Sequence, residues 1–434
     1  MTFYKIIILV VSFFLGSSLA QASDVLRIHG SNTVGAKLMP ALVGQWLQTR
    51  GFAVRSNRFT QENERLITAV KAGERLEIEI HAHGSSTGFK SVKKSQAGLA
   101  MSSRPIKAKE IKSLSYLGDL SDPDKEVVVG VDGIAVVVHP SNPVTALSMS
   151  QLQAVFSGVI QNWASLGGPS QPIQVYARDN QSGTYDTFKS LVLGKKRPLV
   201  ASAKRYESND DLSDDVSQDV TGIGFVGLPS IRNAKALAVA DGRNTAILPS
   251  ELSVATEDYP LSRRLYVYQP NPDNALAADL ARFIKSSQGQ RVVSAVGFIS
   301  QNISAYEIAL GEQYPDSYKE LLDGAYRLSL NFRFKPGAYK LDNKALQDID
   351  RLVEFLNKRS ARQIILAGFS DGAEAAPWRR YVLSTERGDF VAESLIKSDI
   401  TPNTVRGFGS AVQVASNTSP KGRDKNRRVE VWVR

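Results

Sequence analysis

Short apolar runs alternate with amphipathic segments from Val25 to about Ser304. The strand-like run "DVLRIHG" precedes "AKLMPALVGQWLQTRG", and "GIAVVVH" precedes "MSQLQAVFSGVI". Such alternation is typical of an α/β domain built on a mainly parallel sheet. In open sheets of this kind, ligands bind at the loops that follow the strands. The pattern therefore predicts the fold class of residues 23–304 and the loops in which to look for a site.

The pattern changes after residue 304. Residues 305–325 are polar and partly helical, and we expect them to form a linker. "YRLSLNFRF" then alternates apolar residues along one face of a strand, and "RQIILAGFSD" and "RRVEVWV" are further strands. "LSTERGDFVAESLIKS" predicts a helix, and the segment "ALQDIDRLVEFL" predicts another, with helically spaced apolar residues at Leu346, Ile349, Leu352, Val353 and Leu356. We predict a small α+β domain over residues 326–434.

The first 22 residues have the features of an export signal. A lysine near the start precedes an apolar run, and small residues ending in Ala20-Gln21-Ala22 follow. An uncleaved membrane anchor is the alternative, but the apolar run is short for a span. The chain contains no cysteine, which excludes both a disulfide framework and lipid attachment at a cysteine. We therefore expect a protein that is exported to the periplasm.

Positive charge is concentrated at the C-terminal end. From Arg327 onward there are 20 Lys and Arg against 12 Asp and Glu, whereas the preceding residues hold 33 against 31. A basic domain suits an acidic polymer as partner. An exported chain without a recognisable nucleic-acid motif argues against nucleic acid.

Three loops of the first domain combine glycine with hydroxyl side chains: "GSNTV" at 30–34, "GSSTG" at 84–88 and "SGT" at 182–184. Each follows a strand-like run and can begin a helix, where unpaired N–H groups and the helix dipole favour an anion. For any single loop, simple helix capping is the more common role. Their combination with "MSSRPI" at 101–106 and with Arg178 favours an oxyanion site.

These motifs resemble those of the periplasmic phosphate-binding proteins of ABC transporters. The resemblance extends over about residues 25–304 and includes "RDNQSGTYDTF", "GIGFVGL" and "YPLSRRLYVY" in the right order. It implies two α/β lobes that close on phosphate, or a related oxyanion, and a transporter permease as a further partner. By motif position it implies that the anion is bound by Ser31, Asn32, Thr33, Ser85, Ser86, Ser103, Arg104, Arg178, Asp179, Ser182, Gly183 and Thr184.

Asp179 is the unusual member of this set, because a carboxylate repels an anion. Phosphate keeps a proton that sulfate lacks, so Asp179 would accept its hydrogen bond and exclude sulfate. The common family pattern places the acid one position later, at Asn180, and some members carry an acid in the "SSR" loop that this chain lacks. The alternative role for Asp179 is a turn carboxylate that pairs with Arg178.

Other chemistries have weaker support in the sequence. His81 and His83 fall on one face of a strand-like run, but no further residues with metal-ligand spacing join them, so we expect neither a metal nor a cofactor. Ser182 could act as a nucleophile in a phosphatase-like enzyme, yet no base is evident for it. We therefore expect a binding protein and no enzyme. A wall-associated structural protein with a degenerate binding domain is another alternative.

The last 109 residues resemble the OmpA-like peptidoglycan-binding domain through "NFRFKPGAYKL", "AGFSDGAEA", "LSTERGDFV" and "RDKNRRVEVWV". By motif position, Asp371 should bind the amino group of a peptide-stem diamino acid and Arg387 its carboxylate, with Arg427 and Arg428 in support. The Asp371–Arg387 spacing is one residue longer than usual, and Arg380 and Gly388 stand where Asn and Ala are common. The alternative is an ordinary surface ion pair beside a basic face.

Overall fold

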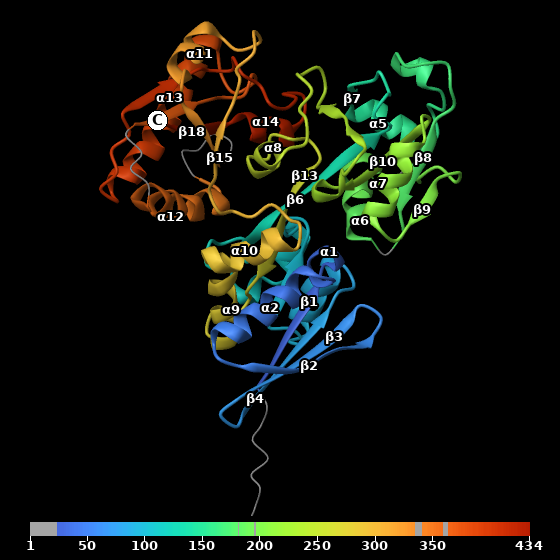
Figure 1. The fold of residues 1–434 in the computed structure, drawn as a ribbon. Helices are drawn as coiled ribbons and strands as arrows, with labels where there is room; N and C mark the ends of the chain where they lie inside the picture. Colours follow the sequence, from blue (N-terminus) through green and yellow to red (C-terminus); the bar gives the residue numbers. More distant parts are fainter. Residues whose placement is uncertain (1–23, 181, 195–196, 335–340, 359–362) are drawn as a thin grey trace, which may run out of the picture.

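The computed structural model describes residues 24–180, 182–194, 197–334, 341–358 and 363–434. The predicted export signal at residues 1–22 lies outside them. Figure 1 shows three parts: a first lobe at the bottom, a second lobe in green, and a C-terminal domain in orange and red. In the part of the chain that is described, no helix is long and apolar enough to cross a membrane.

One sheet runs through both lobes in the order β2-β3-β4-β1-β5-β13-β6-β10-β8-β9. The pairs β1–β4, β1–β5, β10–β8 and β8–β9 are parallel, whereas β13 and β6 are antiparallel to their neighbours. The expected α/β class is confirmed, with a mixed sheet. β6 (Glu126–Val138) and β13 (Ser262–Tyr268) pass between the lobes and form the hinge strands. β6 is buried along nearly all of its length, which explains its continuous apolar sequence.

The first lobe packs helices on its part of this sheet. β4 alternates buried Leu76, Ile78 and Ile80 with charged residues, so that one face meets the core. Trp46 of α2 is buried in the same core. The remaining elements of this lobe are β1 (Asp24–Gly30), α1 (Asn32–Gly35), α2 (Leu38–Thr49), β2 (Ala53–Gln61), β3 (Glu64–Lys71), β4 (Glu74–His81), α3 (Ser85–Lys93), β5 (Leu99–Ser102), α4 (Ala108–Ser113), α9 (Ala275–Lys285) and α10 (Ser287–Ala295).

The second lobe has its own core around Trp163, Phe188 and Phe225. The rings of Phe188 and Phe225 stack with their centroids 4.0 Å apart. Its elements are β7 (Ala146–Ser148), α5 (Met149–Phe156), β8 (Gln174–Arg178), α6 (Gly183–Phe188), β9 (Lys204–Tyr206), α7 (Asn209–Gln218), β10 (Gly222–Gly227), β11 (Lys235–Ala236), β12 (Ala238–Ala240) and α8 (Glu251–Ala255).

The C-terminal domain is a five-stranded sheet in the order β14-β15-β18-β16-β17. α12 and α13 contribute to the core on one face of the sheet, and α11 packs on the other through Tyr318 against Phe369 and Trp432. Its elements are β14 (Ala305–Glu307), α11 (Asp316–Leu322), β15 (Tyr326–Arg333), α12 (Asn343–Lys358), β16 (Ile364–Gly368), α13 (Pro377–Ile396), β17 (Thr404–Gly407), α14 (Pro420–Asn426) and β18 (Arg428–Val433).

Two details of this domain differ from the sequence expectations. Residues 305–325, expected to be a linker, supply β14 and α11; β14 pairs with β15, and Tyr318 is buried. Most side chains of this segment are polar, so its sequence did not predict that the few aromatic and apolar residues pack against the domain. Leu346 has the helical spacing of a core residue but is 40% exposed. Helical spacing alone does not show how wide the buried face of α12 is.

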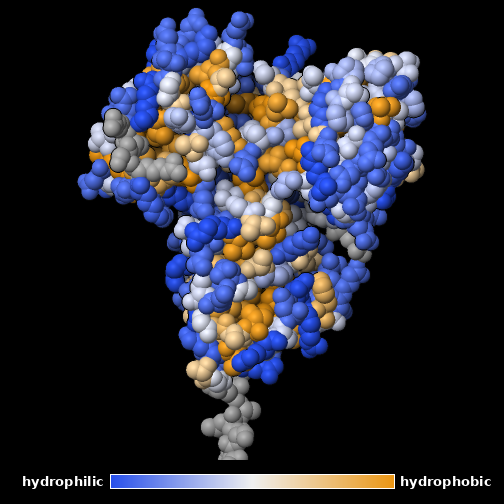
Figure 2. Space-filling model, viewed as in Figure 1, coloured by the Kyte–Doolittle hydropathy of each residue, from blue (hydrophilic) through white to orange (hydrophobic). Residues whose placement is uncertain are grey.

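The C-terminal domain contacts both lobes. Asn343 Nδ2 donates to Glu126 Oε1 at 2.9 Å, at the start of β6. Arg333 Nη2 donates to Asp258 Oδ1 at 2.9 Å, on the second lobe. On the hinge strand β13, Arg264 pairs with Glu257 and also with Asp342 of the C-terminal domain, at 2.8 Å from Asp342 Oδ2. Figure 2 shows hydrophobic side chains where the three parts meet, between surfaces that are mostly hydrophilic.

Candidate functional site

Three of the predicted anion loops lie side by side in the first lobe. They follow β1, β4 and β5, which are neighbouring parallel strands, so their carboxyl ends meet at one edge. Backbone hydrogen bonds join the loops: Ser31 N donates to Met101 O at 2.9 Å, and Gly84 N donates to Gly30 O at 2.7 Å. Helices α1 and α3 begin within the first two loops, at Asn32 and Ser85. Strand-to-helix turns of this kind direct backbone N–H groups toward one point.

The second and third loops contact one another through predicted site residues. Ser103 N donates to Ser85 Oγ at 3.1 Å, and Arg104 Nη2 donates to Ser86 Oγ at 3.0 Å. Arg104 also forms a two-pronged ion pair with Glu110, at 2.7 and 2.9 Å. Burial opposes the ionisation of Glu110, but its hydrogen bonds with Arg104 and Lys107 N outweigh burial and lower its pKa. Glu110, which no motif marked, therefore compensates the charge of Arg104.

The fourth loop meets the first across the two lobes. Gly183 O lies 3.5 Å from Thr33 Oγ1, and a Cβ atom added to Gly183 would stand 2.8 Å from Thr33 Cα. Only glycine allows this approach between backbones. Ser182 begins α6, and its Oγ accepts from Tyr185 N at 3.3 Å, so the capping role is present. The structure thus brings residues 31–33 and 182–184 together in a closed arrangement of the lobes.

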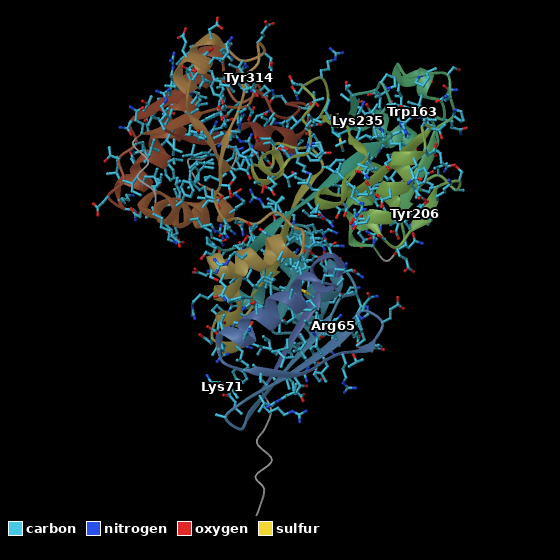
Figure 3. All side chains as sticks on the ribbon, viewed as in Figure 1. Arg65, Lys71, Trp163, Tyr206, Lys235 and Tyr314 are labelled. Atoms are coloured by element: carbon cyan, nitrogen blue, oxygen red, sulfur yellow. The ribbon has the colours of Figure 1, made fainter. Side chains whose placement is uncertain are left out.

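Arg178 and Asp179 lie at the end of β8. Arg178 Nε donates to the carbonyl of Tyr206, which is on the second lobe (Figure 3), at 3.2 Å, and Nη2 donates to Glu207 O. Asp179 Oδ2 is 3.8 Å from Arg178 Nη2, as the turn-pairing alternative predicts. Burial lowers the pKa of Arg178, and the two acidic neighbours oppose that shift. In this structure the guanidinium of Arg178 contacts its own lobe, and no contact of Arg178 with Thr33 is found among the described residues.

Arg263, on hinge strand β13, is a residue that the sequence analysis missed. Its Nη2 donates to Thr33 Oγ1 at 2.9 Å and to Gly183 O at 3.3 Å, so it bridges the first and fourth loops. Its Nε lies 3.4 Å from Asp132 Oδ2 on β6, and Asp132 accepts from Thr187 Oγ1 at 2.8 Å. Burial lowers the pKa of Arg263, although Asp132 opposes this shift. The sequence feature that could have identified Arg263 is the pair of adjacent arginines inside the apolar run "YPLSRRLYVY".

In the C-terminal domain, the two predicted ligand-binding groups are buried. Asp371 is 1% exposed and accepts from Arg427 Nη1 at 2.5 Å and from Ala373 N at 2.8 Å. Arg387 is 2% exposed; Nη1 donates to Phe369 O, and Nη2 pairs with Glu374. Among the described residues Asp371 and Arg387 do not pair with each other. A surface ion pair between them, which was the alternative to ligand binding, is therefore not found in the described part, and each group has a different, internal partner.

Glu374 was not recognised as a site residue. It belongs to the long loop between Asp371 and α13, and its carboxylate meets Arg387 where the resemblance would place a ligand carboxylate. Arg380 Nε holds the same loop by donating to Ala375 O at 2.7 Å. The unusual Gly388 also has a local reason, because an added Cβ atom would lie 2.5 Å from Val405 Cγ1 on β17. The longer loop, Arg380 and Gly388, which depart from the usual motif, are thus each explained by local packing.

Three of the four histidines, His29, His81 and His83, cluster on the first lobe. His81 stacks on His29 with ring centroids 4.1 Å apart, and His83 Nε2 is 2.9 Å from Glu64 Oε1. Burial and the nearby His81 lower the pKa of His29 to about 4, so it is neutral near pH 7. Within the described ranges, no group of three or more potential ligands could hold a metal ion.

Comparison with known proteins matches both regions of the chain. Residues 63–288 match the model of a PBP superfamily domain, and residues 333–427 match the OmpA family. The phosphate-binding protein PstS of Pseudomonas aeruginosa is 32% identical over 257 residues, covering 55% of this chain and 78% of the relative. Protein SphX of Synechococcus elongatus is 30% identical over 260 residues, with coverages of 55% and 73%.

The chain belongs to the PBP superfamily and carries a C-terminal domain of the OmpA family. Both resemblances seen in the motifs are therefore confirmed. Among solved structures, a possible phosphate-binding protein from Planctomyces limnophilus matches with a TM-score of 0.53 at 21% identity, over 70% of this chain and 97% of that chain. At this identity the structural match supports the fold alone.

Proposed function

We propose that the chain is a periplasmic phosphate-binding protein that its C-terminal domain attaches non-covalently to peptidoglycan. The two functional units would be residues 23–304 and the C-terminal domain, and residues 1–22 would be the export signal. The relatives named for phosphate binding support phosphate as the anion. Attachment to the wall would hold a phosphate receptor at high local concentration, close to a transporter permease that accepts its ligand.

The observation that carries this proposal is the contact of Thr33 with Gly183. It joins the oxyanion loops of the two lobes, and Arg263 supplies a buried positive charge at the same place. Hydroxyls, helix N-termini and one guanidinium are the groups that bind a dehydrated oxyanion. Ser182 Oγ accepts a backbone hydrogen bond as a helix cap, which favours binding over attack by this hydroxyl.

Isothermal titration of residues 23–434 with phosphate and then with sulfate tests the proposal. We expect phosphate to bind and sulfate to be excluded, and we expect Asp179→Asn to admit sulfate, because the carboxylate repels a fully ionised anion. Asp124→Asn, which changes an exposed carboxylate of the first lobe, is the matched control. Failure of both anions to bind the folded chain would refute phosphate capture. Sedimentation with purified peptidoglycan tests the attachment, which Asp371→Ala should weaken.

A further inference from the structure

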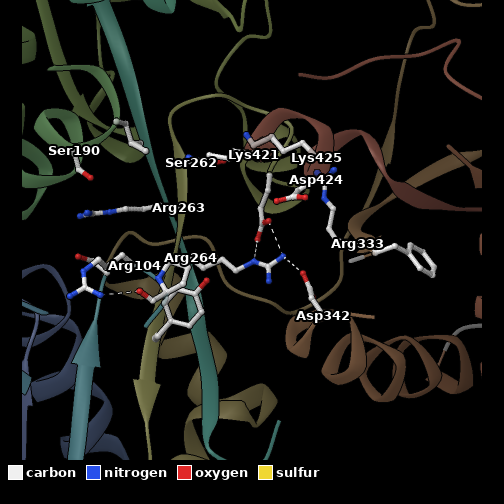
Figure 4. A pocket seen from close by; sticks show the side chains of 16 residues that line it. Arg104, Ser190, Ser262, Arg263, Arg264, Arg333, Asp342, Lys421, Asp424 and Lys425 are labelled. Atoms are coloured by element: carbon white, nitrogen blue, oxygen red, sulfur yellow. Dashed lines mark hydrogen bonds and ion pairs between the residues drawn. The ribbon is translucent and has the colours of Figure 1, made fainter. Parts of the chain in front are cut away.

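A cavity of about 420 Å³ lies where the two lobes and the C-terminal domain meet (Figure 4). Its walls come from the third loop at Ser103–Pro105, from Leu191 of the second lobe, and from hinge strand β13. The C-terminal domain closes it with Phe334, next to β15, and with two lysines of α14. The cavity therefore shares Ser103, Arg104 and Arg263 with the candidate oxyanion site, whereas the two lysines belong to the cavity alone.

Positive charge in this cavity exceeds what its acidic residues compensate. Lys421 and Lys425 line it, and neither forms an ion pair within the described part of the chain; Lys425 Nζ donates only to a carbonyl, Tyr259 O, at 3.0 Å. Arg333 contributes a third cation: its Nη2 pairs with Asp258 Oδ1 at 2.9 Å, whereas Nε and Nη1 are buried and make no hydrogen bond among the described residues. Buried donors without an acceptor are costly.

The acidic residues of the walls already have partners. Glu257 pairs with Arg264 at 2.5 Å, and Asp342 pairs with the same guanidinium at 2.8 Å, as the dashed lines of Figure 4 show. Asp424 pairs with Arg427. None of these carboxylates forms an ion pair with Lys421 or Lys425 in the described residues. The two lysines therefore remain available to an incoming anion.

The lysines are also accessible. Lys421 is exposed and Lys425 half-buried, although protein surrounds both, because they face the cavity. Burial, together with the positive charges of Lys421 and Arg333, lowers the pKa of Lys425 to about 7. Burial likewise lowers the pKa of Lys421. A bound anion would reduce the electrostatic repulsion among these positive charges.

The size of the cavity and the apolar part of its walls favour an occupant larger than a bare oxyanion. Cavities of roughly 300–1,000 Å³ hold small organic ligands, and this cavity falls within that range. Leu191, Tyr266 and Phe334 are among the residues that line it. Apolar side chains in such a wall offer a surface to the body of a ligand.

We propose that this cavity binds a small organic anion, with its apolar body against the apolar part of the wall and its phosphate or carboxylate group on Lys421 and Lys425. Because hinge strand β13 and the C-terminal domain both form the walls, the occupant links the receptor lobes to the wall-binding domain. The proposal does not depend on which anion the loops bind.

Isothermal titration of residues 23–434, in saturating inorganic phosphate, with phenyl phosphate and separately with benzoate tests this site. We expect at least one probe to bind, and Lys421→Ala to weaken that binding by about tenfold through the loss of a charge-assisted contact. Lys397→Ala, which removes a solvent-exposed lysine of the same domain, should leave it unchanged.

The two probes separate the possible head groups. Binding of phenyl phosphate alone assigns a phosphate group, and binding of benzoate alone assigns a carboxylate. Binding of neither probe, or binding that Lys421→Ala does not weaken, overturns the proposal. Inorganic phosphate itself should bind wild type and Lys421→Ala alike, so a failure at the oxyanion loops is distinguishable from a failure at this cavity.

Discussion

Both candidate binding regions pair their charged residues internally, but to different extents. At the candidate oxyanion loops, Arg263 pairs with Asp132 and still donates to Thr33 and Gly183, so its charge reaches the place where the two lobes meet. In the C-terminal domain, Asp371 and Arg387 are buried and paired with Arg427 and Glu374. A motif can therefore mark the place of a site, whereas the surrounding fold determines whether its charges face a ligand or each other.

The largest effect should come from the buried pair in the C-terminal domain. Arg427→Ala leaves the Asp371 carboxylate, which is 1% exposed, without its guanidinium partner. Loss of one partner of a buried pair costs about 3–5 kcal/mol, and we expect this loss in the free energy of unfolding measured by urea denaturation. Arg379→Ala, at an exposed position, should change it by less than about 0.5 kcal/mol. Equal free energies of unfolding for Arg427→Ala and Arg379→Ala would contradict a structural role for the pair.

The contact between the lobes should be sensitive to a single methyl group. Gly183→Ala places a Cβ atom 2.8 Å from Thr33 Cα, so the lobes cannot approach as closely. We expect phosphate affinity, measured by isothermal titration, to fall by about tenfold, equivalent to about 1.4 kcal/mol. Gly44→Ala is the matched control, since nothing lies within 4 Å of an added Cβ atom there. Unchanged affinity in Gly183→Ala would show that closure does not need this contact.

Neutralising Glu374 tests whether an internal carboxylate occupies the proposed peptidoglycan site. Glu374→Gln keeps an oxygen near Arg387 but removes the negative charge that compensates it. We expect binding to purified peptidoglycan to strengthen by about fivefold, or about 1 kcal/mol, because the ligand carboxylate no longer competes with an internal one. Glu354→Gln, whose exposed carboxylate pairs with Lys358, is the control. Weaker binding in Glu374→Gln would instead make Glu374 part of the binding surface.

The last prediction concerns the pH dependence of stability. The pKa of Lys425 is lowered to about 7 in the folded chain, so the unfolded chain binds more protons between about pH 7 and the ordinary lysine pKa. Stability contributed by this group therefore rises with pH through that window and is lost as pH falls through 7. We expect the melting temperature of Lys425→Met to depend less on pH between 7 and 9 than that of wild type. Parallel curves would contradict this assignment.

Much of the fold could be predicted because it follows from local patterns. The loops at Ser31, Gly84 and Ser182 follow strands and begin helices as their composition indicated. The strands and helices of the C-terminal domain match the apolar spacing. The packing of residues 305–325 was not predicted, because a three-residue strand and Tyr318 are weak local signals. The aromatic partners of Tyr318 also lie far along the chain.

The sequence alone was sufficient to identify the two families, the order of their elements and the loops that carry the candidate site. Strand alternation, helix spacing and glycine-hydroxyl turns are local properties, so they can be read from the chain. The partners of the charged groups were decided only in the folded molecule. Glu110 compensates Arg104, Arg263 joins loops 150 residues apart, and Glu374 meets Arg387. Ion pairing depends on distance and burial in three dimensions, and neither quantity is encoded in the spacing of residues along a motif.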